Sequence, residues 1–407
     1  MKKTTPLFSV GKLVYPEWGR GALVLWMICC WLTPGPAQER LWLDQATING
    51  KPCRLLLDTG ADGYWLFSSA AERLGLGMQE VKPWFGSRKP YRRISKCQVD
   101  YGQGPCQTRC FIYELPPFLS DKKLEGDGFV GWPQLGKRIV RFYPPNGKLE
   151  FLPQVPPEAL GWTKLPLRTR WKSKVSWSWR ILALELPQTN GSRGAIIVDT
   201  GSDAGVVLNP ERWGQWKSAH PNHPSTLTAV FGLSRGVMVR EQAWTEAIDL
   251  GPLNLTGVVV EGAETWSTGK VAPDDHVAIL GLAALKRLDL IVDSRQGLAY
   301  VRPRNTPPLA GPHNRLGAVF VPGKTHPDEL VAHVVVESPA WQAGVRNGDR
   351  LLEVDGQAVS PAPLKAFSML KAGTKVQLTL KRGSERLKTT AVLREILAPE
   401  KDAAGTN

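Results

Sequence analysis

The sequence has no Cys-x-x-Cys pair, and the cysteines at positions 53, 97, 106 and 110 lie far from the nearest histidine, His220. Zinc sites are usually built from closely spaced cysteine and histidine ligands, so this spacing disfavours a zinc site. Long helical stretches are also scarce, because 33 prolines and 40 glycines interrupt the 407 residues. Short apolar runs between turn residues are typical of strands. We therefore expect mainly β structure.

The sequence also lacks an apolar run as long as a membrane-spanning helix, which needs about 20 residues. The apolar run at residues 21–32 follows several basic residues and precedes the small-x-small pattern Gly35-Pro36-Ala37. This arrangement is typical of a secretory signal, so we expect residues 1–37 to be a signal peptide. The protein would then be exported to the periplasm or the extracellular space. An uncleaved N-terminal membrane anchor is the alternative interpretation.

Four cysteines, Cys53, Cys97, Cys106 and Cys110, remain beyond the signal segment and fall within one region of the chain. In an exported protein this pattern favours two disulfides, for which three connectivities exist. Metal ligation is the competing interpretation.

The formal net charge is +14, with basic runs at residues 88–93 and 168–174. Such runs occur in nucleic-acid-binding surfaces and also in ordinary solvated loops. For an exported chain we favour loops and expect no nucleic-acid partner.

One motif occurs twice. Leu55-Leu56-Leu57-Asp58-Thr59-Gly60-Ala61 recurs as Ile196-Ile197-Val198-Asp199-Thr200-Gly201-Ser202, 141 residues later. Three aliphatic residues indicate a buried strand, and the Asp-Thr-Gly that follows places a carboxylate at the strand's rigid end. An Asn-Gly pair, a strong hairpin signal, precedes each motif by the same interval.

The later parts of both segments also match, which indicates an internal duplication. We place the first unit at 38–153 and the second at 162–303, joined by a proline-rich linker. A second proline-rich stretch, at 303–312, precedes a third unit of different pattern at 315–397.

The paired motifs resemble those of the pepsin and retropepsin superfamily of aspartic peptidases. The resemblance implies a bilobal acid-protease fold in which Asp58 and Asp199 form one catalytic dyad. Two carboxyl groups held together retain one proton, so the ionised member can activate a water while the other hydrogen-bonds the scissile carbonyl. Water is then the nucleophile, and the chemistry needs neither a metal nor a cofactor. The substrates would be polypeptides, and a chain with both lobes would act as a monomer.

The resemblance also assigns supporting roles around the dyad. Thr59 and Thr200 would hydrogen-bond across the lobes and hold the two loops together. Gly60 and Gly201 would offer N–H groups to the carboxylates. The hairpin turn at Tyr101 and Gly102 would form a flap over the substrate. Ser202 can donate a hydrogen bond to Asp199, whereas Ala61 cannot do so for Asp58. On this ground we expect Asp199 to ionise more readily.

The third unit contains Leu316-Gly317-Ala318-Val319-Phe320, followed by Ser-Pro-Ala and Asn-Gly-Asp patterns, and is similar to the PDZ domains of bacterial exported proteases. That similarity implies a small α+β domain whose N–H groups at Leu316, Gly317 and Ala318 bind a peptide's terminal carboxylate. Peptide C-termini are thus expected partners. A non-catalytic peptide-binding adaptor and a protein that processes only its own chain are the alternative functions.

Overall fold

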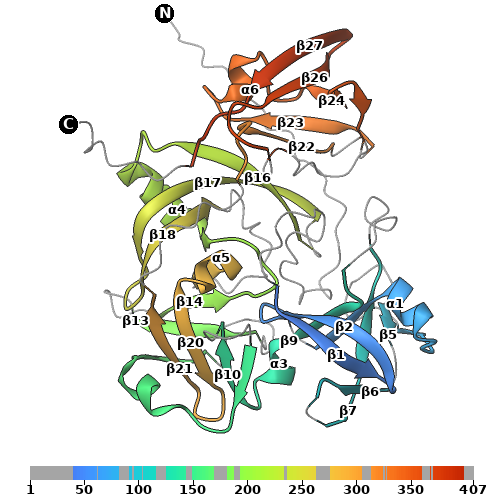
Figure 1. Ribbon diagram of the computed structural model, residues 1–407, viewed down its shortest axis with the longest axis vertical. Coiled ribbons are helices and arrows are strands. Elements are labelled where there is room, and N and C mark those ends of the chain that lie inside the picture. Colours follow the sequence, from blue (N-terminus) through green and yellow to red (C-terminus); the bar gives the residue numbers. More distant parts are fainter. Residues whose placement is uncertain are drawn as a thin grey trace, which may run out of the picture.

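The computed structural model describes residues 40–61, 63–81, 91–93, 96–102, 104–115, 125–143, 149–168, 181–187, 193–232, 236–262, 276–304, 313–323, 326, 328–359, 367 and 370–397. The expected signal peptide and the Asn190-Gly191 turn lie outside these residues. Within them the fold is mainly β, as expected: two lobes, a sheet between the lobes and a C-terminal module of residues 313–397 (Figure 1).

The first lobe is a nine-stranded sheet in the order β4-β5-β8-β3-β9-β2-β1-β6-β7. Its strands are β1 Trp42–Ile48, β2 Lys51–Asp58, β3 Tyr64–Phe67, β4 Gln79–Val81, β5 Tyr91–Arg93, β6 Cys97–Asp100, β7 Cys106–Thr108, β8 Cys110–Tyr113 and β9 Gly128–Gly131, with helices α1 Ser68–Arg73 and α3 Trp132–Leu135. The hairpin of β1 and β2 turns at Asn49 and Gly50, whose φ angles of 50° and 75° are those that an Asn-Gly turn favours. Burial of Leu55, Leu56 and Leu57 on both faces makes β2 a central strand that ends at Asp58.

The second lobe repeats this arrangement. Its seven-stranded sheet has the order β13-β14-β19-β15-β18-β17-β16, which corresponds strand for strand to β1-β2-β9-β3-β8-β5-β4 of the first lobe. Its elements are β13 Ala183–Pro187, β14 Arg193–Val198, β15 Val206–Leu208, β16 Ser225–Gly232, β17 Gly236–Asp249, β18 Asn254–Gly262, β19 His276–Leu280, α4 Pro210–Ala219 and α5 Leu282–Leu285. The duplication read from the sequence is therefore also a duplication of topology.

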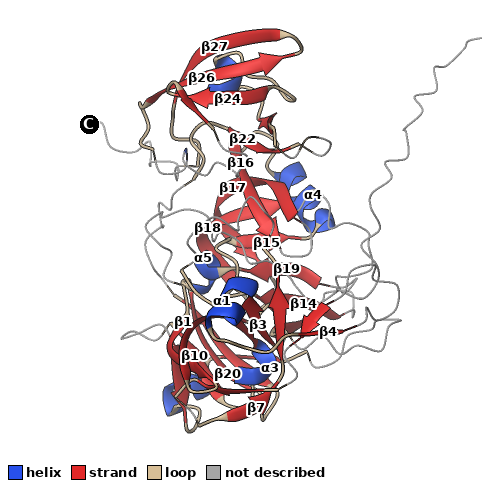
Figure 2. Ribbon diagram, turned by 90° about the vertical axis from the view of Figure 1, so that its right-hand side faces the viewer, coloured by secondary structure: helices blue, strands red, loops and turns tan. Residues whose placement is uncertain are grey.

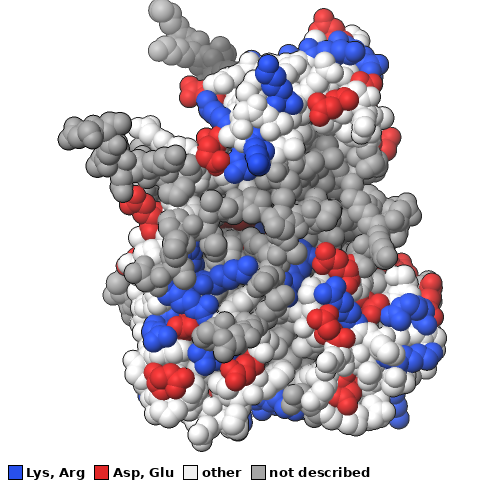
Figure 3. All heavy atoms as spheres, in the orientation of Figure 1, with Lys and Arg blue, Asp and Glu red and all other residues white. Residues whose placement is uncertain are grey.

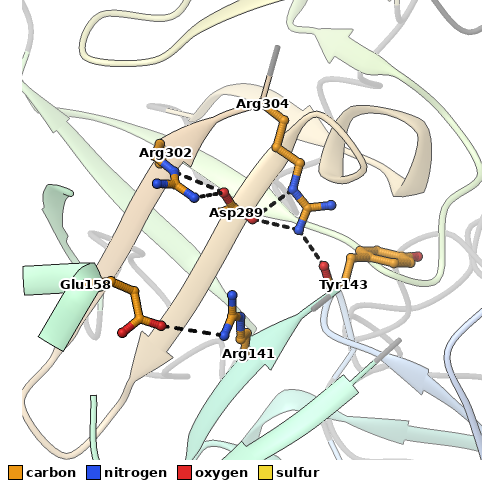
Figure 4. A network of polar contacts seen from close by, with 6 residues as sticks. All are labelled: Arg141, Tyr143, Glu158, Asp289, Arg302 and Arg304. Carbon is orange, nitrogen blue, oxygen red and sulfur yellow. Dashed lines mark hydrogen bonds and ion pairs between the residues drawn. The ribbon is translucent and has the colours of Figure 1, made fainter. Parts of the chain in front are cut away.

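A five-stranded sheet in the order β11-β10-β20-β21-β12 joins the lobes. It takes strands from both repeats: β10 Ile139–Phe142, β11 Leu149–Leu152, β12 Thr163–Pro166, β20 Leu288–Asp293 and β21 Leu298–Pro303. A 3-10 helix, η1, at Pro157–Gly161 lies in the linker between them. On this sheet Asp289 accepts hydrogen bonds from Arg302 and Arg304, and Arg304 also donates to the Tyr143 carbonyl of the first repeat (Figure 4). The ends of the two repeats are thus held together by backbone pairing and by charge.

The C-terminal module is a separate sheet of β22 Ala318–Pro322, β23 Leu330–Val334, β24 Arg350–Val354, β25 Gln357–Ala358, β26 Lys375–Arg382 and β27 Glu385–Val392, with helix α6 Pro339–Gln342. Its core includes Leu316, Phe320 and Leu378. Figure 2 shows the module above the second lobe, next to the β16–β17 hairpin. On the face in Figure 3, the described Lys and Arg side chains are interspersed with Asp and Glu over the lobes and the module.

The expectation of two disulfides is wrong for this structure. Cys53, Cys97, Cys106 and Cys110 are all free thiols, and three of the four are buried. Cys53, Cys97 and Cys110 lie in the apolar core of the first lobe, where thiols pack as small hydrophobic side chains. Among the described residues, no helix is long and apolar enough to cross a membrane.

Candidate active site

The two Asp-Thr-Gly motifs meet at the junction of the lobes. Asp58 is the last residue of β2, and Asp199 directly follows β14. Each of these central strands pairs in parallel with a neighbour, β2 with β9 and β14 with β19. Both aspartates are fully buried, and the carboxyl group of each lies against the glycine of the opposite motif. The structure thus brings together two carboxyl groups that are 141 residues apart in the sequence.

Thr59 and Thr200 link the two loops through four hydrogen bonds. The Thr59 hydroxyl donates to the Val198 carbonyl at 2.6 Å and accepts from the Thr200 N–H at 3.0 Å. The Thr200 hydroxyl donates to the Leu57 carbonyl at 2.7 Å and accepts from the Thr59 N–H at 3.1 Å. Because both threonines are buried, each of these bonds satisfies a group that would otherwise be costly to bury. The crossed bonds fix the position of each aspartate relative to the other.

Gly60 and Gly201 allow the close approach of the loops. The N–H of each donates at 2.9 Å to Oδ1 of the aspartate in its own loop. A Cβ atom on Gly60 would lie 2.7 Å from Cγ of Asp199, and one on Gly201 would lie 2.6 Å from Cγ of Asp58. Any side chain at either glycine would therefore push the opposite carboxyl group out of place.

The surroundings favour the protonated form of the pair. Burial, and then the charge and hydrogen bond of Asp199, raise the pKa of Asp58 well above its usual range. Burial also raises the pKa of Asp199, to about 7, although the hydrogen bond with Asp58, the Gly201 N–H and the Arg240 charge oppose the rise. Oδ2 of each aspartate has no donor among the described residues. One proton shared between the two groups would supply that donor, so the site favours a singly protonated pair.

The Ser202 hydroxyl does not have the role expected from the sequence. It accepts a hydrogen bond from the Ala204 N–H at 3.3 Å, and no bond from it to Asp199 occurs among the described residues. The charge of Arg240 opposes the rise in the pKa of Asp199. The Arg240 guanidinium also pairs with Glu261 at 3.2 Å, both side chains being almost fully buried. Sequence reasoning missed this ion pair, because the two residues are joined only by the pairing of β17 with β18.

Tyr101 and Gly102, the residues expected to form the flap, lie at one end of the first-lobe sheet. They form the turn between β6 and β7, and β6 pairs with β1 at the end of the sheet away from β4 and β5. The Tyr101 hydroxyl donates to the Gln134 carbonyl of α3 at 3.0 Å, and its ring lies 6.5 Å from that of Phe151. By strand correspondence the β4–β5 hairpin is the counterpart of the β16–β17 hairpin, so those two hairpins occupy equivalent positions in the lobes.

Among the described residues, no group of three or more His, Cys, Asp or Glu side chains is arranged to hold a metal ion. The donors around the dyad are hydroxyl and backbone N–H groups, which suit carboxylates. The described part of the site is thus equipped for proton transfer between two carboxyl groups and a third, bound group.

The expected carboxylate-binding loop of the C-terminal module is already occupied. The N–H groups of Leu316 and Gly317 both donate to Oδ1 of Asn314, at 3.0 and 3.3 Å. Gly317 has a φ of +70°, and a Cβ atom there would lie 2.2 Å from Cβ of Ser338, so the loop conformation requires glycine. Asn314 was not singled out from the sequence. The one available signal was its place two residues before Leu316, which is typical of a turn closed by an asparagine side chain.

Two comparisons with protein families agree with these features. The profile of a family described as aspartyl protease matches residues 45–85, which contain Asp58, and a PDZ domain profile matches residues 330–382. No curated protein matches the chain. Among solved structures, EIAV protease complexed with the inhibitor HBY-793 is similar, with 19% sequence identity, a TM-score of 0.19, and coverage of 25% of this chain and 91% of that chain. The chain is thus similar to aspartyl proteases over the segment around Asp58 and to PDZ domains over residues 330–382.

Proposed function

We propose that the protein is an exported aspartic endopeptidase that hydrolyses peptide bonds at the Asp58–Asp199 pair. The observation that carries the proposal is the pair itself: two buried carboxyl groups in interlocked loops, each against the glycine of the other motif and with raised pKa values. Neither carboxyl group alone provides both an acid and a base, whereas a pair with one proton provides both.

In the proposed reaction the ionised carboxyl group takes a proton from a bound water, which attacks the carbonyl carbon of the scissile bond. The protonated partner hydrogen-bonds the carbonyl oxygen and stabilises the charge that develops there. The N–H groups of Gly60 and Gly201 hold Oδ1 of each aspartate throughout, so little reorganisation is needed. Because both carboxyl groups are fully buried in this structure, a peptide reaches them only after a conformational change exposes them.

The test is cleavage of a random decapeptide library by the protein without residues 1–37, with products identified by mass spectrometry from about pH 3 to about pH 8. We expect the wild type to cleave, and Asp58→Asn and Asp199→Asn each to lose at least about a thousandfold in rate. Asp44→Asn is the matched control, since that side chain is 63% exposed and should leave the rate unchanged. An inert wild type that binds peptides would indicate an adaptor, and cleavage confined to its own chain would indicate self-processing; both would contradict the proposal.

A further inference from the structure

The C-terminal module contacts the second lobe through one face of β22. Val319 and Val321 pack against Leu227 and Ala229 of β16, and all four side chains are buried. Ala318 and Phe320, which alternate with these valines, point into the module's own core instead. Strand β22 therefore has two apolar faces, one internal to the module and one used for contact with the β16–β17 hairpin.

The opposite face of the same hairpin packs toward the dyad. Val230 of β16 and Met238 of β17 belong to a cluster with Ile197 and Ala204, which flank Asp199 in sequence. The hairpin is thus held between the module on one side and the strand and loop that carry Asp199 on the other. Loss of the contact with the module would remove packing from one face of the hairpin. The other face packs on the strand and loop that carry Asp199.

Asn314 joins this contact to the loop expected to bind peptide carboxylates. Its Oδ1 accepts from the N–H groups of Leu316 and Gly317, while its Nδ2 donates to the Leu227 carbonyl at 2.9 Å and to the Ala318 carbonyl at 2.8 Å. The Asn314 carbonyl also accepts from the Thr226 hydroxyl at 2.8 Å. One buried side chain therefore occupies the loop and bonds to the hairpin at the same time.

We propose that Asn314 is an internal ligand of the carboxylate loop, and that a peptide C-terminus displaces it and thereby releases the module from the β16–β17 hairpin. A carboxylate accepts hydrogen bonds from N–H groups more strongly than a neutral amide oxygen does, so the exchange is chemically favourable. Once the Asn314 side chain leaves the loop, its bond to the Leu227 carbonyl is lost as well. Docking and peptide binding then exclude each other. The consequence for catalysis rests on the proposed peptidase function, but the exchange itself does not.

The competition between docking of the module and peptide binding can be measured without cleavage in the protein that carries both Asp58→Asn and Asp199→Asn. Val319→Asp places a charge in the contact with β16 but not in the module's own core. Val392→Asp is the matched control, because Val392 is 51% exposed. The probe is a fluorescent pool of random decapeptides with a free terminal carboxylate, compared with the same pool amidated. Binding is read by polarisation, and support of the hairpin by hydrogen exchange of residues 225–231.

We expect the Val319→Asp variant to bind the free-carboxylate pool at least about tenfold more tightly than the same protein with Val319 unchanged. The reason is that the substitution removes the docked state that competes with peptide binding. Hydrogen exchange at residues 225–231 should be faster in the Val319→Asp variant. It should also become faster when the free-carboxylate pool is added to the protein with Val319 unchanged. Val392→Asp and the amidated pool should change neither quantity. Unchanged affinity in Val319→Asp, or a pool that binds without any change in exchange, would overturn the proposal.

Two substitutions at Asn314 separate the two roles of its side chain. Asn314→Ala removes both the internal ligand and the bond to Leu227, so tighter peptide binding is expected. Asn314→Asp keeps an acceptor in the loop but loses both donations, so the hairpin should exchange faster while peptide binding stays weaker than in Asn314→Ala. Equal binding by these two variants would contradict the assigned role of Oδ1. Because none of these measurements needs cleavage, failure of the peptidase proposal would leave their interpretation intact.

Discussion

Asp58 and Asp199 are buried where ionisation is unfavourable, and this sets the sign of their effect on stability. A carboxyl group whose pKa is higher in the folded protein than in the unfolded chain binds its proton more tightly when folded. Its contribution to stability is therefore fully present below the unfolded pKa of about 4 and is lost as the pH rises through the folded value. For Asp199 that value is about 7, so the pair should weaken the fold between mildly acidic and neutral pH.

Asp199→Asn should consequently stabilise the protein relative to wild type as the pH is raised. The amide is neutral at every pH in this range and can still accept the Gly201 N–H. We expect the difference in unfolding free energy between variant and wild type to grow by at least about 1 kcal/mol from pH 5 to about pH 8. Urea unfolding at both pH values measures it, with Asp44→Asn as the exposed control. A difference that does not depend on pH would contradict the raised pKa.

The two loops that carry the aspartates hold each other in position through hydrogen bonds between their threonines. Each threonine hydroxyl both donates to a carbonyl and accepts from an N–H of the opposite motif. Removing one hydroxyl leaves a buried carbonyl and a buried N–H without their partners and loosens the contact between the loops. Removing the second hydroxyl should then cost less stability than it does in the intact protein.

Thr59→Val and Thr200→Val should each destabilise the protein by roughly 2 kcal/mol, because valine preserves the shape but not the hydrogen bonds. The double variant should cost less than the sum of the two, by at least about 0.5 kcal/mol, since the pair acts as a unit. Chemical denaturation of the four proteins completes the cycle. Additive costs would show that the two loops are held independently.

Asp289 has the opposite pH behaviour on the sheet between the lobes. Burial acts to raise its pKa, but the hydrogen bonds and charges of Arg302 and Arg304 outweigh it and hold the pKa below the usual range. Its contribution to stability is therefore present above the unfolded pKa of about 4 and is lost as the pH falls through the folded value.

Asp289→Asn should destabilise the protein by about 1 to 2 kcal/mol at neutral pH, and the deficit should shrink as the pH falls toward 3. Urea unfolding at both pH values tests this. Glu158→Gln is the control from the same sheet region, because its contact with Arg141 is 4.0 Å long and its side chain is 58% exposed (Figure 4). Equal effects of the two substitutions would show that the network around Asp289 contributes little.

Local patterns predicted part of this architecture. The aliphatic run before Asp-Thr-Gly and the Asn49-Gly50 turn are encoded within a few residues, so both could be located from sequence. The pairing of β5 with β8 and of β6 with β1 is not local, so the place of the Tyr101-Gly102 turn in the sheet could not be predicted from the sequence. The free cysteines and the dual bonding of Asn314 likewise depend on distances that only the folded chain defines.

At the scale of the whole molecule, both halves of the proposed site belong to one chain, and the sheet between the lobes draws strands from both repeats. A site of this kind does not require two subunits to meet. We therefore expect specific activity to stay constant within about twofold when the protein is diluted from micromolar to nanomolar concentration, as for a monomer. Peptide cleavage across a dilution series measures this, and a loss of specific activity on dilution would indicate obligate association.

The matched strand order of the lobes has a consequence for the direction of a bound peptide. Two equivalent half-sites related by approximate twofold symmetry accept a chain equally well in either orientation. The C-terminal module breaks that equivalence, because it contacts the β16–β17 hairpin of the second lobe. We therefore expect the two ends of a substrate to contact different surroundings. The module would in this way favour one orientation of the bound peptide in an otherwise symmetric site.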